Sequence, residues 1–89
     1  MYYVYLLNDP SSSAIYIGYT ADLRRRFQEH QILKRHRGWR LVYYEAYLDE
    51  RDARKRERKL KDYGSSLGKL KERIAPSLAG SGIERAGSQ

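Results

Sequence analysis

The sequence predicts an α+β fold that begins with an antiparallel hairpin of two strands. Two observations predict this class. Residues 2–7 and 14–19 are short runs rich in aromatic and β-branched side chains, and turn-forming residues separate them. Beyond them, one more β-favouring run lies between segments of helical periodicity. The element order is therefore strand, strand, helix, strand, helix, helix. Apolar residues on both sides of the strands indicate a sheet covered in part on both faces.

The turn formers at 8–13 predict a hairpin loop longer than the tightest types. If the loop is symmetric about the bond between Pro10 and Ser11, Tyr5 lies directly opposite Tyr16. Both rings would then occupy one face of the sheet, whereas a shift of one residue would place them on opposite faces. The hairpin therefore predicts a pair of neighbouring tyrosines, for which simple cross-strand packing is the ordinary interpretation.

Residues 22–33 have the periodicity of an amphipathic helix. At about 100° per residue, Leu23 and Phe27 form its apolar stripe. Arg26 and His30 lie one turn apart and border the same stripe, so we expect both on the side that packs against the protein. Taken singly, such a histidine is usually structural and such an arginine is usually a surface charge.

The run 40–47 predicts a third strand, and two helices follow it. Alternation places Leu41, Tyr43, Glu45 and Tyr47 on one face, and Val42, Tyr44 and Ala46 on the other. The first helix covers 49–63 and ends before Gly64, and Pro76 ends the last one. We expect one folded domain over residues 1–75. Residues 76–89 are rich in glycine, serine and alanine and predict a disordered tail.

Glu57 is the unexpected acid in the second helix. On an ideal helix it falls within about 40° of Ala53 and close to Leu60, on the face that should dock onto the sheet. A carboxylate buried without a partner is costly, so this one needs a cation or a hydrogen-bond donor. One interpretation is a structural ion pair with a nearby arginine. The other is a hard divalent cation such as Mg²⁺, which is often held by one or two carboxylates plus water and substrate phosphate.

The charge balance favours a polyanionic partner. The 89 residues contain 18 Lys and Arg against 11 acids, a net charge of +7, and they form one small domain. A solvated basic surface is the alternative. Nine tyrosines against one Phe and one Trp support a binding surface, because tyrosine packs like an aromatic and keeps a hydroxyl for hydrogen bonding.

Several classes of protein are excluded or made improbable by composition. Without cysteine the chain has neither disulfides nor thiolate metal sites. No apolar run reaches the length of a membrane span, and residues 1–5 lack the features of a signal peptide. We therefore expect a cytoplasmic protein that does not enter a membrane. The oligomeric state is left open, and a monomer is compatible with everything above.

Five segments in order carry a resemblance to a known family. They are Tyr3-Val4-Tyr5, Tyr16-Ile17-Gly18, the helix 22–30 with an arginine and a histidine four residues apart, the strand 41–45, and the helix 53–61 with its glutamate. Together they resemble the GIY-YIG nuclease superfamily, in the small stand-alone bacterial form related to the N-terminal nuclease domain of the excision-repair protein UvrC. The match covers residues 2–74, and five motifs with suitable spacing are far more specific than one. Two departures are Tyr3 in place of a glycine and the lack of an Asn after Asn8.

The resemblance implies both architecture and activity. It implies a three-stranded antiparallel sheet with the first strand central, flanked by about three helices. It further implies a metal-dependent endonuclease that hydrolyses DNA phosphodiester bonds, uses one Mg²⁺ or Mn²⁺ ion, and takes part in DNA repair or processing. DNA rather than RNA is the implied partner, and cutting would be structure-dependent or weakly specific.

The resemblance and the residue chemistry together assign roles. Glu57 is the metal ligand. Arg26 binds a phosphate oxygen, because its planar guanidinium suits that task. One of Tyr5 and Tyr16 is the general base and the other orients water or phosphate. A tyrosine pKa starts near ~10 and must be lowered by positive charge for such a base, while His30 supplies charge or accepts the proton.

Other basic side chains are interpreted as contacts to the DNA backbone. They are Arg24, Arg25, Lys34, Arg35, Arg37, Arg54, Lys55 and Arg58. For each of them a solvated helix face is the alternative. Two further functions also stay open: a module of the same fold that binds nucleic acid without cutting it, and a small basic protein that binds structured RNA.

Overall fold

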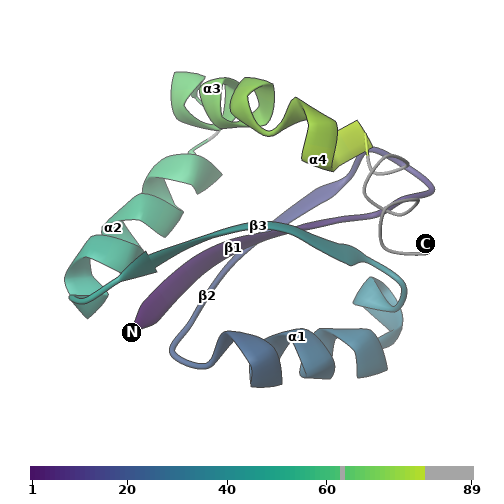
Figure 1. Ribbon diagram of the computed structural model, residues 1–89, viewed down its shortest axis with the longest axis horizontal. Coiled ribbons are helices and arrows are strands. Elements are labelled where there is room, and N and C mark those ends of the chain that lie inside the picture. The colour runs from purple at the N-terminus through teal and green to yellow at the C-terminus, as the bar shows by residue number, and fades with distance from the viewer. Residues whose placement is uncertain (63, 80–89) are drawn as a thin grey trace.

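A three-stranded antiparallel sheet with helices on both faces forms the structure (Figure 1). The computed structural model describes residues 1–62 and 64–79. The strands are β1 (Tyr2–Asn8), β2 (Ile15–Thr20) and β3 (Arg40–Tyr47), in the order β2-β1-β3. The helices are α1 (Leu23–Ile32), the 3₁₀ turn η1 (Lys34–His36), α2 (Glu50–Lys61), α3 (Ser65–Arg73) and α4 (Ala75–Ala79). The predicted fold class, with the first strand central, is confirmed.

The hairpin register differs from the symmetric one. Tyr5 pairs with Gly18, and Tyr16 pairs with Leu7, so the prediction that Tyr5 faces Tyr16 directly is wrong by two residues. The strand extends to Asn8 because Asp9, and not Pro10, starts the turn. The Asp9 carboxylate accepts hydrogen bonds from the residues that follow it, and its N–H donates to the carbonyl of Ala14.

The error in register leaves the two tyrosines on the same face. Side chains alternate with a period of two, so a shift of two residues preserves which face each one occupies. Tyr5 and Tyr16 are therefore diagonal neighbours across β1 and β2, with ring centroids 6.2 Å apart. The prediction of neighbouring tyrosines is confirmed, although the pairing that produced it is not.

A β-bulge in β3 overturns the prediction for one of its faces. Tyr43 pairs with Leu6, but Leu41 pairs with Leu7, so Val42 is an additional residue on the β3 side. The bulge moves Leu41 to the face that carries Tyr44, instead of the face that carries Tyr43. Strict alternation could not predict this, because a bulge adds one residue without changing the β-favouring composition.

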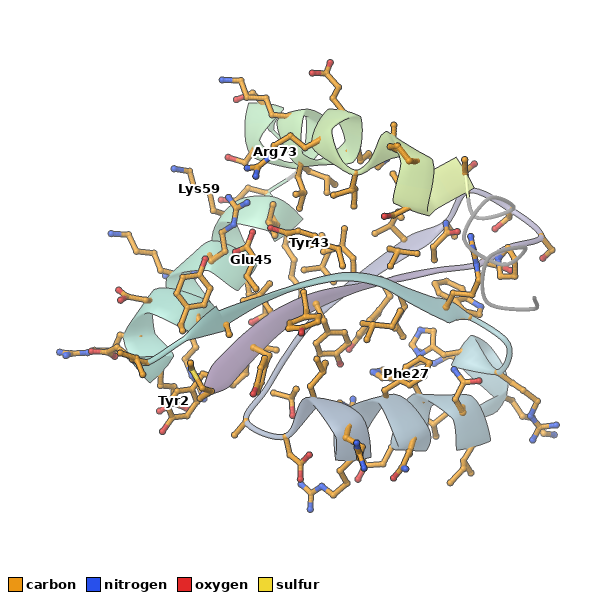
Figure 2. The ribbon with its side chains drawn as sticks, in the orientation of Figure 1. Tyr2, Phe27, Tyr43, Glu45, Lys59 and Arg73 are labelled. Carbon is orange, nitrogen blue, oxygen red and sulfur yellow. The ribbon has the colours of Figure 1, made fainter. Side chains whose placement is uncertain are left out.

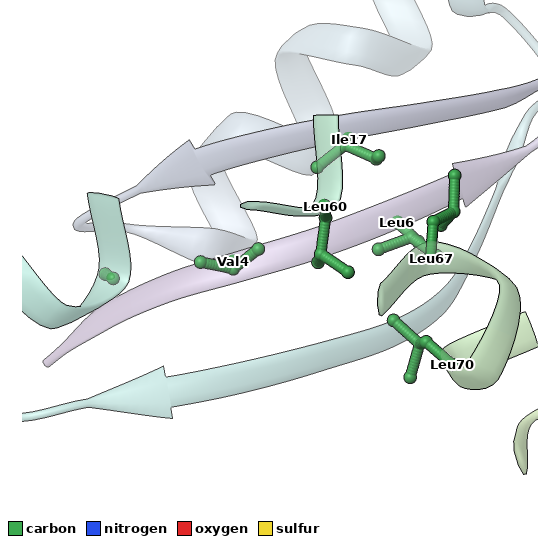
Figure 3. Packing of buried hydrophobic residues seen from close by; sticks show 7 residues of the cluster. Val4, Leu6, Ile17, Leu60, Leu67 and Leu70 are labelled. Carbon is green, nitrogen blue, oxygen red and sulfur yellow. The ribbon is translucent and has the colours of Figure 1, made fainter. Parts of the chain in front are cut away.

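The main hydrophobic core lies between the sheet and α2 and α3. Its buried members are Val4, Leu6, Ile17, Ala53, Leu60, Leu67 and Leu70 (Figure 3). Burying a side chain such as leucine contributes about 1.5–3 kcal/mol, so this layer supplies most of the driving force for folding. Its strand residues point away from the face that carries Tyr5 and Tyr16.

The polar side of the same interface is a carboxylate bound by three donors. The guanidinium of Arg56 on α2 donates to both oxygens of Glu45 on β3, at 2.9–3.2 Å. Tyr43 and Tyr47 donate their hydroxyls to the same carboxylate. Figure 2 shows Glu45 and Tyr43 on the α2 side of the sheet. Although burial alone would raise it, the pKa of Glu45 is lowered, because these donors stabilise the charged form.

The helix boundaries agree with the sequence except near Pro76. Asp22 caps α1 by accepting from the N–H of Arg25, and Asp49 caps α2 by accepting from the N–H of Arg51. Pro76 was expected to end the helical region, but α4 continues from Ala75 to Ala79. Proline is tolerated there because the first turn of a helix needs no N–H donor from it. Of the predicted tail 76–89, residues 76–79 belong to α4, and the rest lies outside the described residues. No described helix could span a bilayer.

Candidate active site

Tyr5 crosses directly over Gly18. A Cβ atom added at Gly18 would lie 2.3 Å from Cζ of the Tyr5 ring, far inside any real contact. Because Gly18 of the second motif has no side chain, it leaves the space that the ring of Tyr5 from the first motif occupies. As a result Tyr5 is fully buried, with 0% of its surface exposed, and its hydroxyl points away from the main core.

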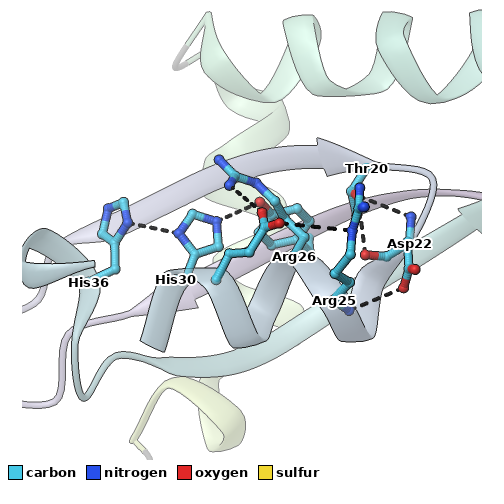
Figure 4. Close-up of polar contacts among 8 residues, drawn as sticks. Thr20, Asp22, Arg25, Arg26, His30 and His36 are labelled. Carbon is cyan, nitrogen blue, oxygen red and sulfur yellow. Dashed lines mark hydrogen bonds and ion pairs between the residues drawn. The ribbon is translucent and has the colours of Figure 1, made fainter. Parts of the chain in front are cut away.

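The Tyr5 hydroxyl begins a buried chain of hydrogen bonds. Its oxygen lies 2.8 Å from Nε2 of His30, which is the one buried residue of α1. Nδ1 of His30 lies 2.9 Å from Nδ1 of His36 on η1 (Figure 4). The two histidines are 1% and 7% exposed. Tyr5, His30 and His36 thus form one continuous polar path through the α1 side of the molecule.

Tyr16 packs against this chain and keeps an open side. Its ring centroid lies 5.0 Å from that of His30 and 4.6 Å from that of His36. Unlike Tyr5, Tyr16 is only half-buried. It belongs to β2, which is an edge strand of the sheet. Tyr16 is therefore the tyrosine that water and substrate can reach.

Arg26 brings positive charge to both tyrosine hydroxyls. Its guanidinium interacts with Tyr5 and with Tyr16, and Nη1 donates to Oε1 of Glu29 at 3.0 Å. Glu29, followed by the two tyrosines, raises the pKa of Arg26, while burial opposes the rise. The arginine side chain is 35% exposed, so it is both held in place and accessible.

Burial shifts the pKa of Tyr5 and the pKa of His30 in opposite directions. Burial, with a further contribution from Tyr16, raises the pKa of Tyr5 to about 12, although Arg26 opposes the rise. Burial, Arg26 and His36 lower the pKa of His30 to about 4. At neutral pH Tyr5 is therefore a phenol and His30 a neutral imidazole, so the pair carries no charge.

Glu57 lies on α2, which covers the opposite face of the sheet. Its side chain is 22% exposed, and Oε2 pairs with Nζ of Lys61 at 3.0 Å. Lys61 in turn lines a cavity of about 310 Å³ beside β2, together with Tyr16. Glu57 and Lys61 thus lie on the α2 side of the sheet, whereas the Tyr16 ring packs against His30 and His36 on the α1 side. The predicted arginine partner of Glu57 is a lysine instead.

Few protein side chains are close enough together to bind a metal ion. Within residues 1–62 and 64–79 there is no group of three or more His, Cys, Asp or Glu side chains that could hold an ion. A single partly exposed carboxylate fits Mg²⁺ or Mn²⁺, which take waters and substrate phosphate as their other ligands. It does not fit zinc, which proteins hold with three or four His, Cys or carboxylate side chains.

The predicted apolar stripe of α1 is only partly covered. Leu23 and Phe27 are half-buried, whereas His30 next to them is buried. Both line an open groove of about 690 Å³ with Tyr3, Leu41 and Tyr44, and Phe27 points from α1 toward the sheet (Figure 2). The prediction that Arg26 and His30 face the protein is correct. The stripe itself contributes less packing than its periodicity suggests.

The predicted DNA-contacting side chains fall into two groups. Five belong to α1, η1 and the residue after it, and the other three belong to α2, on the opposite face (Figure 1). All eight residues are exposed. Arg54 lies 5.1 Å from the Tyr19 ring centroid and pairs with Glu50, and Arg37 donates to the carbonyl of Ile32. No single flat surface unites the two groups.

His36 is the member of this cluster that the sequence did not indicate. His36 lies between the predicted helix 22–33 and the predicted strand 40–47, yet it contacts His30, Tyr16 and Trp39. The available signal was a second histidine six positions after the first, in a chain that contains only two. Its spacing does not match one helical face, so periodicity alone gave no reason to pair them.

Comparison with known families assigns the chain. The family model of the GIY-YIG catalytic domain matches residues 1–71, which include the whole sheet, α1 and α2. Comparisons with curated proteins and with solved structures found no match. The match covers both tyrosine motifs and all five residues predicted for the site. The chain is a member of the GIY-YIG nuclease family.

Proposed function

We propose that this protein is a divalent-metal-dependent DNA endonuclease. The observation that carries the proposal is the convergence of Tyr5, Tyr16, Arg26 and His30 on one side of the sheet. A guanidinium beside two phenols, one of them open to solvent, combines a phosphate-binding group with a candidate base. Family membership supplies the reaction class, because a nuclease acts on nucleic acid.

Tyr16 rather than Tyr5 acts as the general base toward water. Tyr5 is fully buried, and its pKa of about 12 makes its phenolate inaccessible near neutral pH. Tyr16 is half-buried and has the Arg26 charge beside its hydroxyl. Tyr5 instead fixes the surroundings of Tyr16.

Arg26 binds a non-bridging oxygen of the scissile phosphate. Its guanidinium has five N–H donors, and Glu29 uses only part of them. Bidentate pairing of arginine with phosphate gives both charge compensation and orientation. The Glu29 ion pair holds the side chain before substrate arrives, which reduces the entropy that binding must remove.

Glu57 is the carboxylate that would hold the metal. When bound, one Mg²⁺ or Mn²⁺ ion supplies charge neutralisation at phosphate and at the departing 3′ oxygen. Lys61 presently pairs with Glu57, and its ammonium is free to turn toward phosphate when a cation replaces it. Glu57 and Lys61 would then act from α2 while Arg26 and Tyr16 act from the α1 side.

The substrate is proposed to be DNA of particular structure, handled in repair or processing in the cytoplasm. Contacts from exposed basic side chains to the DNA backbone would dominate recognition, and such contacts fix position without reading sequence. The relation to the UvrC nuclease domain remains a prediction from the motifs.

A nicking assay tests the metal-dependent activity. Supercoiled plasmid is incubated with the protein in Mg²⁺, in Mn²⁺ and in chelator, alongside Glu57→Gln and the matched control Glu50→Gln. Glu50 is an acid on the same helix that pairs with Arg54 and Tyr19. We expect nicking with either metal only, loss of nicking in Glu57→Gln, and wild-type nicking in Glu50→Gln.

Two results would count against this function. Nicking that persists in chelator, or that Glu57→Gln retains in full, removes the metal role of Glu57. A wild-type protein that binds DNA but never cuts any substrate supports the alternative of a non-catalytic binding module. The Glu57–Lys61 ion pair is the observation that favours that alternative, because it already satisfies the carboxylate.

A further inference from the structure

The contact between the two histidines joins two ring nitrogens of the same kind. It joins Nδ1 of His30 to Nδ1 of His36 at 2.9 Å, inside the protein. Two bare nitrogens would repel and two N–H groups would clash, so the bond contains a single proton. A neutral imidazole has one N–H donor and one bare acceptor nitrogen. If Nδ1 of His30 carries the proton, Nε2 of His30 is therefore bare. If His36 carries it, Nε2 of His30 is protonated.

The contact that Nε2 of His30 makes shows which histidine carries the proton between the two Nδ1 atoms. Its Nε2 contacts the Tyr5 hydroxyl at 2.8 Å. A phenol, with an ordinary pKa near ~10, is a far better donor than neutral imidazole N–H, and an imidazole nitrogen is a better acceptor than a phenol oxygen. Tyr5 therefore donates to Nε2 of His30. It follows that His30 carries its proton on Nδ1 and donates it to His36.

We propose that His36 is a positioning residue of the active site, which fixes the tautomer of His30 and thereby directs the hydroxyl proton of Tyr5 away from Tyr16. The tautomer of His30 does not depend on the proposed nuclease function, whereas its effect on cleavage rests on that function. The oxygen of Tyr5 is left with lone pairs that face Arg26 and Tyr16. Arg26 can only donate, so it needs that acceptor, and Tyr16 gains a fixed partner beside the cavity.

The charges around His36 are compatible with an acceptor role. Arg35 on η1 and Arg26 on α1 face it and, after burial, contribute to lowering its pKa. Glu29 on α1 acts on His30, and Tyr16 contributes a ring from β2. His36 is therefore neutral near pH 7, with Nδ1 free to accept. Within the described ranges its Nε2 has no hydrogen-bond partner and is not fully enclosed, so water serves it.

Removing His36 should release the whole chain of hydrogen bonds. The Nδ1–H of His30 would be buried without an acceptor, and His30 could place its proton on Nε2 and donate to Tyr5 instead. The Tyr5 proton would then turn toward Tyr16, because Arg26 offers no acceptor. Groups that orient a reacting side chain through a hydrogen bond typically affect rates by about 10- to 100-fold.

Nitrogen NMR of the imidazoles tests the assignment without any cleavage. In ¹⁵N-labelled wild-type protein at pH 7, without metal, we expect neutral His30 with a protonated Nδ1 and neutral His36 with a protonated Nε2. A wild-type His30 protonated on Nε2 overturns the proposal, whether or not the protein cuts DNA. A failure of the proposed function would leave this spectrum unchanged, so the two failures are distinguishable.

Two variants then test the consequence. His36→Phe keeps a ring against Tyr16 and Trp39 but removes the acceptor. His36→Asn restores an acceptor oxygen on a smaller side chain. With single-turnover cleavage we expect kcat to fall about 10- to 100-fold in His36→Phe with KM unchanged, and to recover at least in part in His36→Asn.

The spectra of the variants separate positioning from folding. In His36→Phe the Nδ1 and Nε2 tautomers of His30 should coexist, whereas His36→Asn should restore Nδ1 protonation. If His36→Phe is folded and cleaves at the wild-type rate, or if His30 keeps one tautomer in it, His36 has no positioning role. If His36→Phe does not fold, the wild-type spectrum and His36→Asn still decide.

Discussion

At the scale of single residues, one steric contact explains why the two tyrosine motifs belong together. The Tyr5 ring occupies the space that any side chain at position 18 would need. The contact depends on a register that loop symmetry misplaced by two residues. The sequence therefore predicted the shared face of Tyr5 and Tyr16, but not the reason for Gly18.

Substitution of Gly18 should damage both stability and the site. In Gly18→Ala the new Cβ must displace the Tyr5 ring, and overpacking of this kind costs about 1–3 kcal/mol of unfolding free energy. Gly68→Ala is the matched control, because nothing lies within 4 Å of a Cβ there and alanine favours the helix by about 1 kcal/mol. Urea unfolding measures both. A Gly18→Ala protein as stable as wild type would contradict the contact.

His30 should make stability depend on pH in the acid range. Its folded pKa of about 4 lies below the ordinary value of 6.5, so the unfolded chain binds more protons between these values. The contribution is complete above pH 6.5, declines as pH falls and is lost near pH 4. By linkage it amounts to roughly 3 kcal/mol at most. His36, whose pKa burial also lowers, acts in the same direction.

Urea unfolding between pH 7.5 and 4.5 measures this dependence. Wild-type stability should fall steadily below pH 6.5, and His30→Gln, which has no group to protonate, should show a shallower slope over the same interval. Equal slopes in the two proteins would show that His30 is not held neutral by burial. The exposed carboxylates are the same in both, so they cancel in the comparison.

At the scale of elements, the chain places Tyr5, Arg26 and His30 on one side of the sheet, and its main core on the other, together with Glu57. The order and type of elements followed from periodicity and turn residues, because these are local properties. The bulge at Val42 and the continuation through Pro76 did not, because each depends on packing between elements. That Arg26 and His30 lie on the packing side of α1 was predictable from helix geometry. Their link to His36 was not.

The Arg56–Glu45 ion pair should be the strongest polar tie between α2 and β3. Both side chains are largely buried, at 25% and 15% exposure. Arg56→Ala would leave the Glu45 charge with only two tyrosine donors, so we expect a loss of about 3 kcal/mol, near the range for breaking a buried pair. Arg51→Ala is the control, because its pair with Asp49 is 89% exposed on the arginine side and should matter little. Equal effects of the two substitutions in urea unfolding would refute this tie.

At the scale of the whole molecule, a net charge of +7 is spread over two faces of a small sheet. The eight predicted DNA contacts fall on the α1 side and on α2, separated by the edge strand that carries Tyr16. The sequence could predict the number of basic residues, but not this division. It predicted Glu57 for the site, yet the position of Glu57 across the edge from Tyr16 depends on how α2 packs.

Salt dependence of DNA affinity should report these contacts. Each phosphate contact contributes about −0.9 to the slope of log K against log salt. Arg24→Ala/Arg25→Ala should therefore reduce the slope by up to about 2, while Lys69→Ala/Lys71→Ala, on α3, removes the same charge and should leave it unchanged. Fluorescence anisotropy with a labelled duplex in chelator measures both. Equal changes would indicate that only net charge matters.

The central claim is that Tyr16 does chemistry which Tyr5 and the fold do not provide. Its most direct test is the single-turnover cleavage rate of Tyr16→Phe in Mg²⁺ or Mn²⁺, measured beside DNA affinity and urea stability in the same preparation. Removing only the hydroxyl should reduce the rate by at least about 100-fold, with affinity and stability close to wild type. A Tyr16→Phe protein that binds DNA and cuts it at the wild-type rate would contradict the claim.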